Sequence, residues 1–128
     1  MNVAIVCTAL LGLLLFGLGF HVSLQRRSNR RSIGHDASPL DPLHRAVRAH
    51  ANTAEYAPFF AVLFLWYATR LAPAWIVAVI VLATVARFAL AGALLFGPSL
   101  NRPNPARFFG ALFTYICGLV LAAGLLVT

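Results

Sequence analysis

The sequence predicts an all-α integral membrane protein built as a four-helix bundle. The chain has 128 residues, of which 61% are hydrophobic and only 10% are charged, and its mean hydropathy is +0.85. These values lie far outside the range of soluble globular domains. One bilayer crossing takes about 20 residues, so the chain has room for four spans and no separate soluble domain. We therefore expect one membrane domain that covers residues 1–128.

The first apolar run predicts a transmembrane helix over about 3–24. A cleaved signal peptide is the alternative at an N-terminus, but no Lys or Arg precedes this run and no small-residue cleavage motif follows it. Basic residues come directly after the run instead: Arg26, Arg27, Arg30 and Arg31. Because such clusters are held in the cytoplasm, this helix is expected to run from the outside inward.

Residues 25–42 form a loop by composition, with Ser, Asn, Gly, Asp, Pro and Arg replacing the apolar residues. We interpret its arginines as a topology signal that meets anionic lipid headgroups, and a direct ligand-binding role is the alternative. Asp41 followed by Pro42 is typical of a helix start. The second helix is predicted over about 43–70, and Pro58 inside it is expected to bend the axis.

The third and fourth helices are predicted over about 74–96 and 106–127, separated by a Pro- and Asn-rich loop at 98–105. Both longer loops are basic, whereas Arg70 marks the opposite interface. Both termini are therefore predicted to lie outside, with the loops 25–42 and 98–105 in the cytoplasm.

The charge of the chain indicates a membrane partner and not a nucleic acid. The formal net charge is +7, but the arginines cluster beside apolar runs and do not alternate with exposed aromatics in a soluble module. Membrane lipids are thus the expected partner. Cys7 and Cys117 lie deep in apolar runs, so neither a disulfide nor a metal site is expected.

A polar stripe enters the membrane at the start of the second helix. Arg45, Arg48, Asn52 and Glu55 are spaced three, four and three apart, which places them on one side of a helix. Glu55 and Arg87 are predicted to reach similar depths and to form an ion pair that fixes the second helix against the third. Such a pair leaves Arg48 and Asn52 without an acidic partner, which favours an anionic ligand.

Arg107 adds a positive charge where the second loop meets the fourth helix. The N-terminal helix dipole has the same sign there. A thiol placed beside it would be stabilised as a thiolate.

The run from Arg45 to Pro58 resembles the helix-two signature of the MAPEG proteins, the membrane-associated proteins in eicosanoid and glutathione metabolism. The segment from Arg107 to Thr114 resembles the start of their fourth helix, and the resemblance, to a bacterial-type member, covers nearly the whole chain. It implies a left-handed bundle in the inner or plasma membrane. It also implies a homotrimer that binds glutathione, as co-substrate, between subunits near the cytoplasmic face.

The resemblance also implies site residues by position. Five positions correspond to glutathione-binding or basic positions of the family: Arg48, Asn52, Glu55, Tyr56 and Arg87. Arg107 corresponds to the arginine that stabilises the glutathione thiolate, and is the candidate catalytic residue. The chain departs from the family at Phe88, Leu90 and Leu94, where glutathione-using members place tyrosines or, in many bacterial relatives, a histidine.

Three functions compete at this point. The first is a glutathione transferase or peroxidase acting on lipophilic electrophiles that arrive through the bilayer, without a metal or prosthetic group. The second is a non-catalytic protein that binds a lipid or a protein partner with the same fold. The third, a small transporter or channel, is disfavoured because the polar stripe ends at Glu55 and does not reach the outer face.

Overall fold

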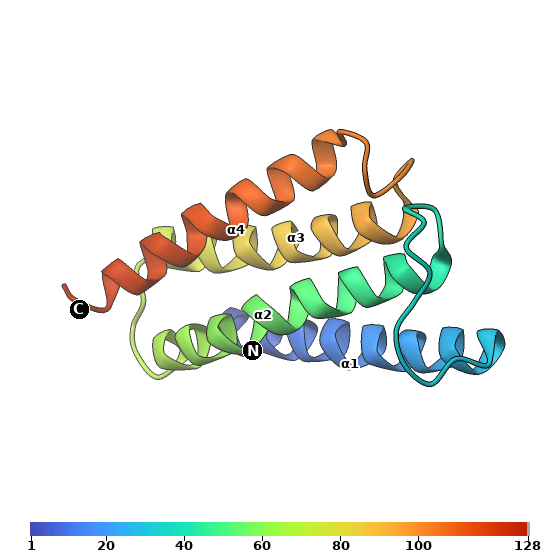
Figure 1. Cartoon of the computed structure of the whole chain (residues 1–128). Coiled ribbons are helices and arrows are strands. Elements are labelled where there is room, and N and C mark those ends of the chain that lie inside the picture. The colour runs from blue at the N-terminus through green and yellow to red at the C-terminus, as the bar shows by residue number, and fades with distance from the viewer. Residues whose placement is uncertain (128) are drawn as a thin grey trace.

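The computed structural model describes residues 1–127, and this part of the chain folds as four helices. They are α1 (Val3–Asn29), α2 (Pro42–Ala68), α3 (Ala74–Phe96) and α4 (Pro105–Gly124). The helices alternate in direction, so the two longer loops lie at one end of the bundle and the short α2–α3 turn at the other (Figure 1). The predicted all-α bundle is confirmed.

Three of these helices are long and apolar enough to cross a membrane: α1, α3 and α4. The remaining helix, α2, matches α1 in length at 27 residues but carries the polar stripe in its first half. Arg45, Arg48 and Glu55 all fall within that half. The polar groups of α2 therefore enter the bundle beside helices of membrane-spanning length.

The helix ends differ from the predicted ones in three places. The first helix continues past residue 24 to Asn29, because its last turn holds Arg26 and Arg27 beside the negative end of the helix dipole. Arg30 then ends it in a left-handed conformation, with φ 50°. At the other two places, α2 stops at Ala68 and α4 at Gly124, so both end before the predicted residues 70 and 127.

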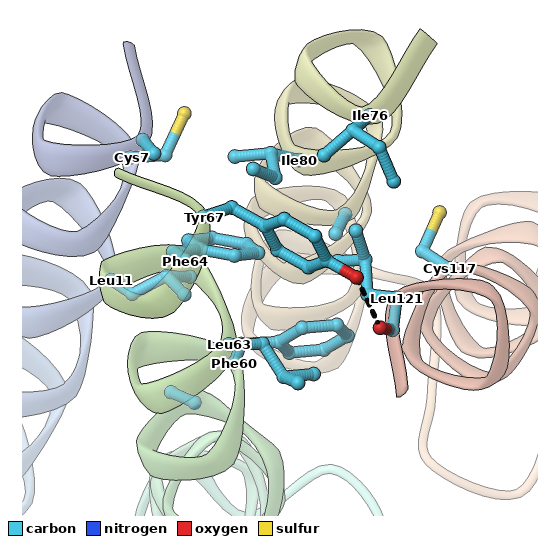
Figure 2. Packing of buried hydrophobic residues seen from close by; sticks show 13 residues of the cluster. Cys7, Leu11, Phe60, Leu63, Phe64, Tyr67, Ile76, Ile80, Cys117 and Leu121 are labelled. Carbon is cyan, nitrogen blue, oxygen red and sulfur yellow. Dashed lines mark hydrogen bonds between the residues drawn. The ribbon is translucent and has the colours of Figure 1, made fainter. Parts of the chain in front are cut away.

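The half of the bundle near the α2–α3 turn has an apolar core to which all four helices contribute. Phe64, Ile76 and Leu121 are fully buried in it. Figure 2 shows Tyr67 lying across this core, with its hydroxyl donating a hydrogen bond of 2.7 Å to the carbonyl of Leu121. The hydroxyl is therefore satisfied inside an otherwise apolar cluster.

Helix α4 packs closely on α3 at Gly110. A Cβ at this position would lie 2.9 Å from the Cβ of Leu90 and 3.1 Å from the carbonyl oxygen of Ala86. Small residues allow such close approach between membrane helices. Gly110 therefore brings the next turn of α4, with Thr114, against the middle of α3.

The loop end of the bundle is tied together by backbone carbonyls and Arg45. The Arg45 guanidinium donates to the carbonyl of Leu94 at 2.9 Å and also to that of Gly97, where α3 ends. The N–H of Leu100 in the second loop donates to the carbonyl of Pro39 in the first at 3.2 Å. Arg45, the first residue of the polar stripe, thus caps a neighbouring helix.

Candidate functional site

Arg87 is the centre of a polar node that joins three helices. Its side chain is 1% exposed, and its guanidinium donates to the Asn52 side-chain oxygen of α2 at 2.5 Å and to the Thr114 hydroxyl of α4 at 3.3 Å. The Arg87 Cζ also lies 5.2 Å from the centre of the Tyr56 ring, within the range of a cation–π contact. We call Asn52, Tyr56, Arg87 and Thr114 the Arg87 node.

The Arg87 node leaves polar atoms unsatisfied. The Nε of Arg87 is buried and has no hydrogen-bond partner among the described residues, and the same holds for the hydroxyl of the neighbouring Thr53. A buried guanidinium in a membrane is costly unless a counter-charge meets it. The hydrogen bonds of the node come from neutral groups, so the positive charge of Arg87 is not neutralised by an ion pair within the part of the chain described.

The predicted ion pair between Glu55 and Arg87 is wrong for the described chain. Glu55 is exposed, and Arg87 bonds Asn52 and Thr114 in its place. The physical reason is the rotation of α2 about its axis. The stripe borders the buried face of the helix, so Asn52 turns toward α3 while Glu55, three residues on, turns outward.

An open groove of about 540 Å³ lies beside the node, between α2 and α4. The end nearer the loops is polar and is lined by Glu55, Tyr56, Thr114 and Tyr115. The other end is apolar and is lined by Phe59, Phe60, Leu63, Gly118, Leu119 and Ala122. A concave site with a few convergent polar groups and an apolar remainder is typical of small-molecule binding.

Arg107 and Arg48 lie outside this groove. The Arg107 guanidinium donates to the carbonyl of Leu100, and the residue lines a separate hollow of about 720 Å³ formed by the second loop and the start of α4. Arg107 precedes Thr114 by seven residues, or about 10 Å along α4. Arg48 is half-buried one turn before Asn52 on α2. The structure thus brings together Asn52, Tyr56 and Arg87, with Glu55 at the rim of the groove.

Sequence reasoning missed Thr114 and Tyr115 as site residues. The Thr114 hydroxyl accepts from Arg87 and donates to the carbonyl of Gly110 at 2.7 Å, and the Tyr115 ring lies 5.8 Å from the Tyr56 ring. The available signal was a pair of hydroxyl-bearing residues in the apolar run of α4. Thr114 follows Gly110 by four positions, so one helix face supplies both the close contact with α3 and the partner of Arg87.

Together, the four helices of alternating direction and the buried arginine between them define a helical membrane protein with a polar site in its loop-side half. More particularly, the chain belongs to the MAPEG family, whose model matches residues 4–127. Searches of the curated proteins and of the solved structures found no match.

Proposed function

We propose that this MAPEG protein is a glutathione-dependent transferase or peroxidase that acts on lipophilic electrophiles. The observation that carries the proposal is the Arg87 node, a buried positive charge without a carboxylate partner in the described chain, beside a groove that is polar at one end and apolar at the other. A guanidinium binds carboxylates in fork geometry, and glutathione carries two of them. A lipophilic electrophile would enter from the bilayer at the hollow beside Arg107, whose lining includes Phe108 and Phe109.

In this proposal the α2 and α3 residues hold the tripeptide: Arg48, Asn52, Glu55, Tyr56 and Arg87. The carboxylate of Glu55 would accept from the glutathione ammonium, while Arg48 and Arg87 would meet its carboxylates. Tyr115 extends the set from α4, because its ring lies beside that of Tyr56 at the polar end of the groove. The glutathione sulfur is expected toward Arg107, where the dipole of α4 is positive.

Arg107 is the proposed catalytic residue. A guanidinium has five N–H donors, so its bond to the Leu100 carbonyl leaves donors for a thiolate. The thiolate would form a bond from sulfur to the electrophilic carbon of the acceptor, with the leaving group departing with its electron pair. The glutathione thiol would lose its proton to water before that step. Arg107 would stabilise the resulting thiolate, and its guanidinium would stay protonated throughout.

We further propose that the protein works as a homotrimer. Glu55 lies exposed on a helix whose neighbours have membrane-spanning length, and a carboxylate facing lipid is expensive. A second copy of the chain against this face would cover Glu55 and the mouth of the groove. The proposed orientation follows the positive-inside rule, with both termini outside and the loops 25–42 and 98–105 in the cytoplasm. The membrane would be the inner or plasma membrane of a bacterium.

The test uses purified protein in detergent with glutathione and a chloro-nitroaromatic acceptor. The proposal predicts a thiolate absorbance band from bound glutathione in the wild type. Arg107→Met should lose this band and lower turnover by about one to three powers of ten. For Arg107→Lys, both the band and the turnover should lie between those of the wild type and of Arg107→Met. Arg70→Met is the control, because Arg70 is exposed at the opposite end of the bundle. No thiolate band in the wild type, or equal turnover in all variants, would contradict the proposal.

A specific observation supports the non-catalytic alternative, a membrane protein that binds a lipid or a partner. Leu90 and Leu94 of α3 are buried in an apolar cluster with Leu18 of α1, and they supply no polar group to a ligand. Glutathione binding without turnover in the assay above would favour this alternative.

A further inference from the structure

Two histidine rings stack face to face at the loop end of the bundle. His35 comes from the loop between α1 and α2, and His44 comes from the first turn of α2. Their ring centres lie 4.1 Å apart, with an angle of 12° between the ring planes. We call this pair the histidine stack.

Both rings of the histidine stack are fixed by backbone carbonyls. The Nδ1 of His35 lies 2.8 Å from the carbonyl oxygen of Asp36. The Nδ1 of His44 lies 3.0 Å from the carbonyl oxygen of Ser38. Because a carbonyl oxygen only accepts hydrogen bonds, each Nδ1 carries a proton in the neutral ring. Each Nε2 is therefore the atom that takes up a further proton.

The histidine stack fixes the part of its loop that contacts the other loop. His44 binds the carbonyl of Ser38, and the next carbonyl, that of Pro39, accepts the N–H of Leu100 at 3.2 Å. Leu100 belongs to the loop between α3 and α4, and its own carbonyl accepts from the Arg107 guanidinium. The backbone of Leu100 thus joins the first loop on one side and Arg107 on the other.

Charged groups of both signs lie on the elements around the histidine stack: Asp36, Asp41 and Arg31 of the same loop, Arg26 of α1, Arg45 of α2, and Arg102 of the loop between α3 and α4. The two carboxylates favour protonated rings, whereas the guanidiniums disfavour them. Arg26 is bonded to the carbonyl that precedes His35, and Arg45 is bonded to carbonyls of α3 and its end. The closest charge that a protonated ring meets is that of the other ring, because the two are in contact.

We propose that the histidine stack is a pH-sensitive switch, which joins the two loops when its rings are neutral and lets them separate when both rings are protonated. An imidazole changes its charge between about pH 5 and pH 8. The repulsion between two protonated rings exists only while they are stacked, so protonation favours the open arrangement and the closed fraction falls as the pH falls. Opening removes the Pro39 partner of Leu100, and the carbonyl that holds Arg107 loses its fixed position.

The effect on turnover rests on the proposed role of Arg107, whereas the movement of the loops does not. The first test therefore measures the distance between spin labels on the two loops, in detergent and without glutathione, at about pH 8 and about pH 5. Ala37→Cys and Arg102→Cys carry the labels, because both positions are exposed and the native thiols Cys7 and Cys117 are buried. With both histidines present, the distance should be longer and more broadly distributed at the lower pH, with unchanged helix content by circular dichroism.

His35→Phe separates ring stacking from ring charge. The Phe ring can still stack on His44, and at low pH a cation–π contact replaces the repulsion, so the loops should stay closed at both pH values. His44→Asn is the second variant, because the Asn amide can donate to the Ser38 carbonyl and does not titrate in this range. It should also stay closed, and it decides the question if His35→Phe does not fold. His21→Phe is the matched control on α1, outside both loops, and should open as the wild type does.

The second test is the turnover of glutathione with the chloro-nitroaromatic acceptor. Between the two pH values, turnover should fall several-fold more in the wild type than in His35→Phe. Loops that open in the wild type and stay closed in His35→Phe, with no turnover in either, would support the switch and contradict the proposed function.

Three results would overturn the proposal. The first is a distance between the loops that does not change with pH when both histidines are present. The second is opening of His35→Phe or His44→Asn to the same extent as the wild type. The third is a loss of helix content at the lower pH, which would show that the chain unfolds in acid and that the loops do not open by themselves.

Discussion

The half of the bundle near the α2–α3 turn is packed from apolar side chains alone, whereas the half near the two loops combines a smaller apolar cluster with arginine hydrogen bonds. In the first half, Phe64 and Leu121 are fully buried and the Tyr67 hydroxyl has its partner. In the second half, Arg45 caps α3, and Arg87 joins three helices while its Nε stays unsatisfied. The turn-side half is therefore held together by apolar packing, and the loop-side half depends in addition on hydrogen bonds from two arginines.

We propose that the turn-side half serves stability and the loop-side half serves binding. A packed apolar core stabilises a fold without selecting a ligand. A buried charge without a counter-ion weakens the fold of the isolated chain, so its presence points to a partner that completes it. Variants of the two halves should therefore separate stability from ligand affinity.

The largest effect on stability is expected from Phe64→Ala. The Phe64 side chain is 0% exposed at the centre of the turn-side core. Its truncation should lower the free energy of unfolding by about 3–5 kcal/mol. Denaturant titration in detergent measures this change. A loss below about 1 kcal/mol would mean that the turn-side half is not the stabilising one.

A smaller effect is expected from Asn52→Leu, which removes the acceptor of one Arg87 N–H. Leaving a charged donor buried without a partner should cost about 1.5–3 kcal/mol. Adding Arg87→Met to Asn52→Leu should restore most of the loss, because the buried charge goes with it. Thermal unfolding of the single and double variants tests this coupling. Additive losses would show that Arg87 stabilises the fold through other contacts.

The smallest effect is expected from Thr53→Val. The Thr53 hydroxyl is buried without a partner among the described residues, so its removal should leave stability unchanged or raise it by about 1 kcal/mol. Thr84→Val is the matched control, because the Thr84 hydroxyl donates to the carbonyl of Ile80 at 2.9 Å. Thr53→Val should be the more stable of the two, and the reverse order in thermal unfolding would contradict the description of the node.

Much of the fold could be predicted from the sequence because the apolar runs have the length of a membrane span. The bounds of α3 were predicted at both ends, and the loop end of the bundle collects every arginine except Arg70 and Arg87. The end of α1 was predicted too early because its last turns are polar, although arginines suit a helix C-terminus.

The partner of Arg87 could not be predicted from spacing. Asn52 and Glu55 share one stripe, and only the rotation of α2 against α3 decides which of them meets the guanidinium. The groove beside Tyr115 also depends on the space left between α2 and α4. Residue spacing predicts which residues share a helix face and how far along the helix they lie. The rotation of each helix about its axis and the crossing angle between two helices depend on side-chain packing.

The measurement that tests the central claim most directly is the affinity for glutathione of three proteins, the wild type, Arg87→Met and Phe64→Leu, by equilibrium dialysis in detergent. Losing a charge-assisted contact should weaken binding to Arg87→Met by about 10- to 100-fold. Phe64→Leu should be less stable than the wild type and yet bind glutathione with wild-type affinity. Equal affinity of the wild type and Arg87→Met would contradict the claim that the loop-side half of the bundle is the binding site.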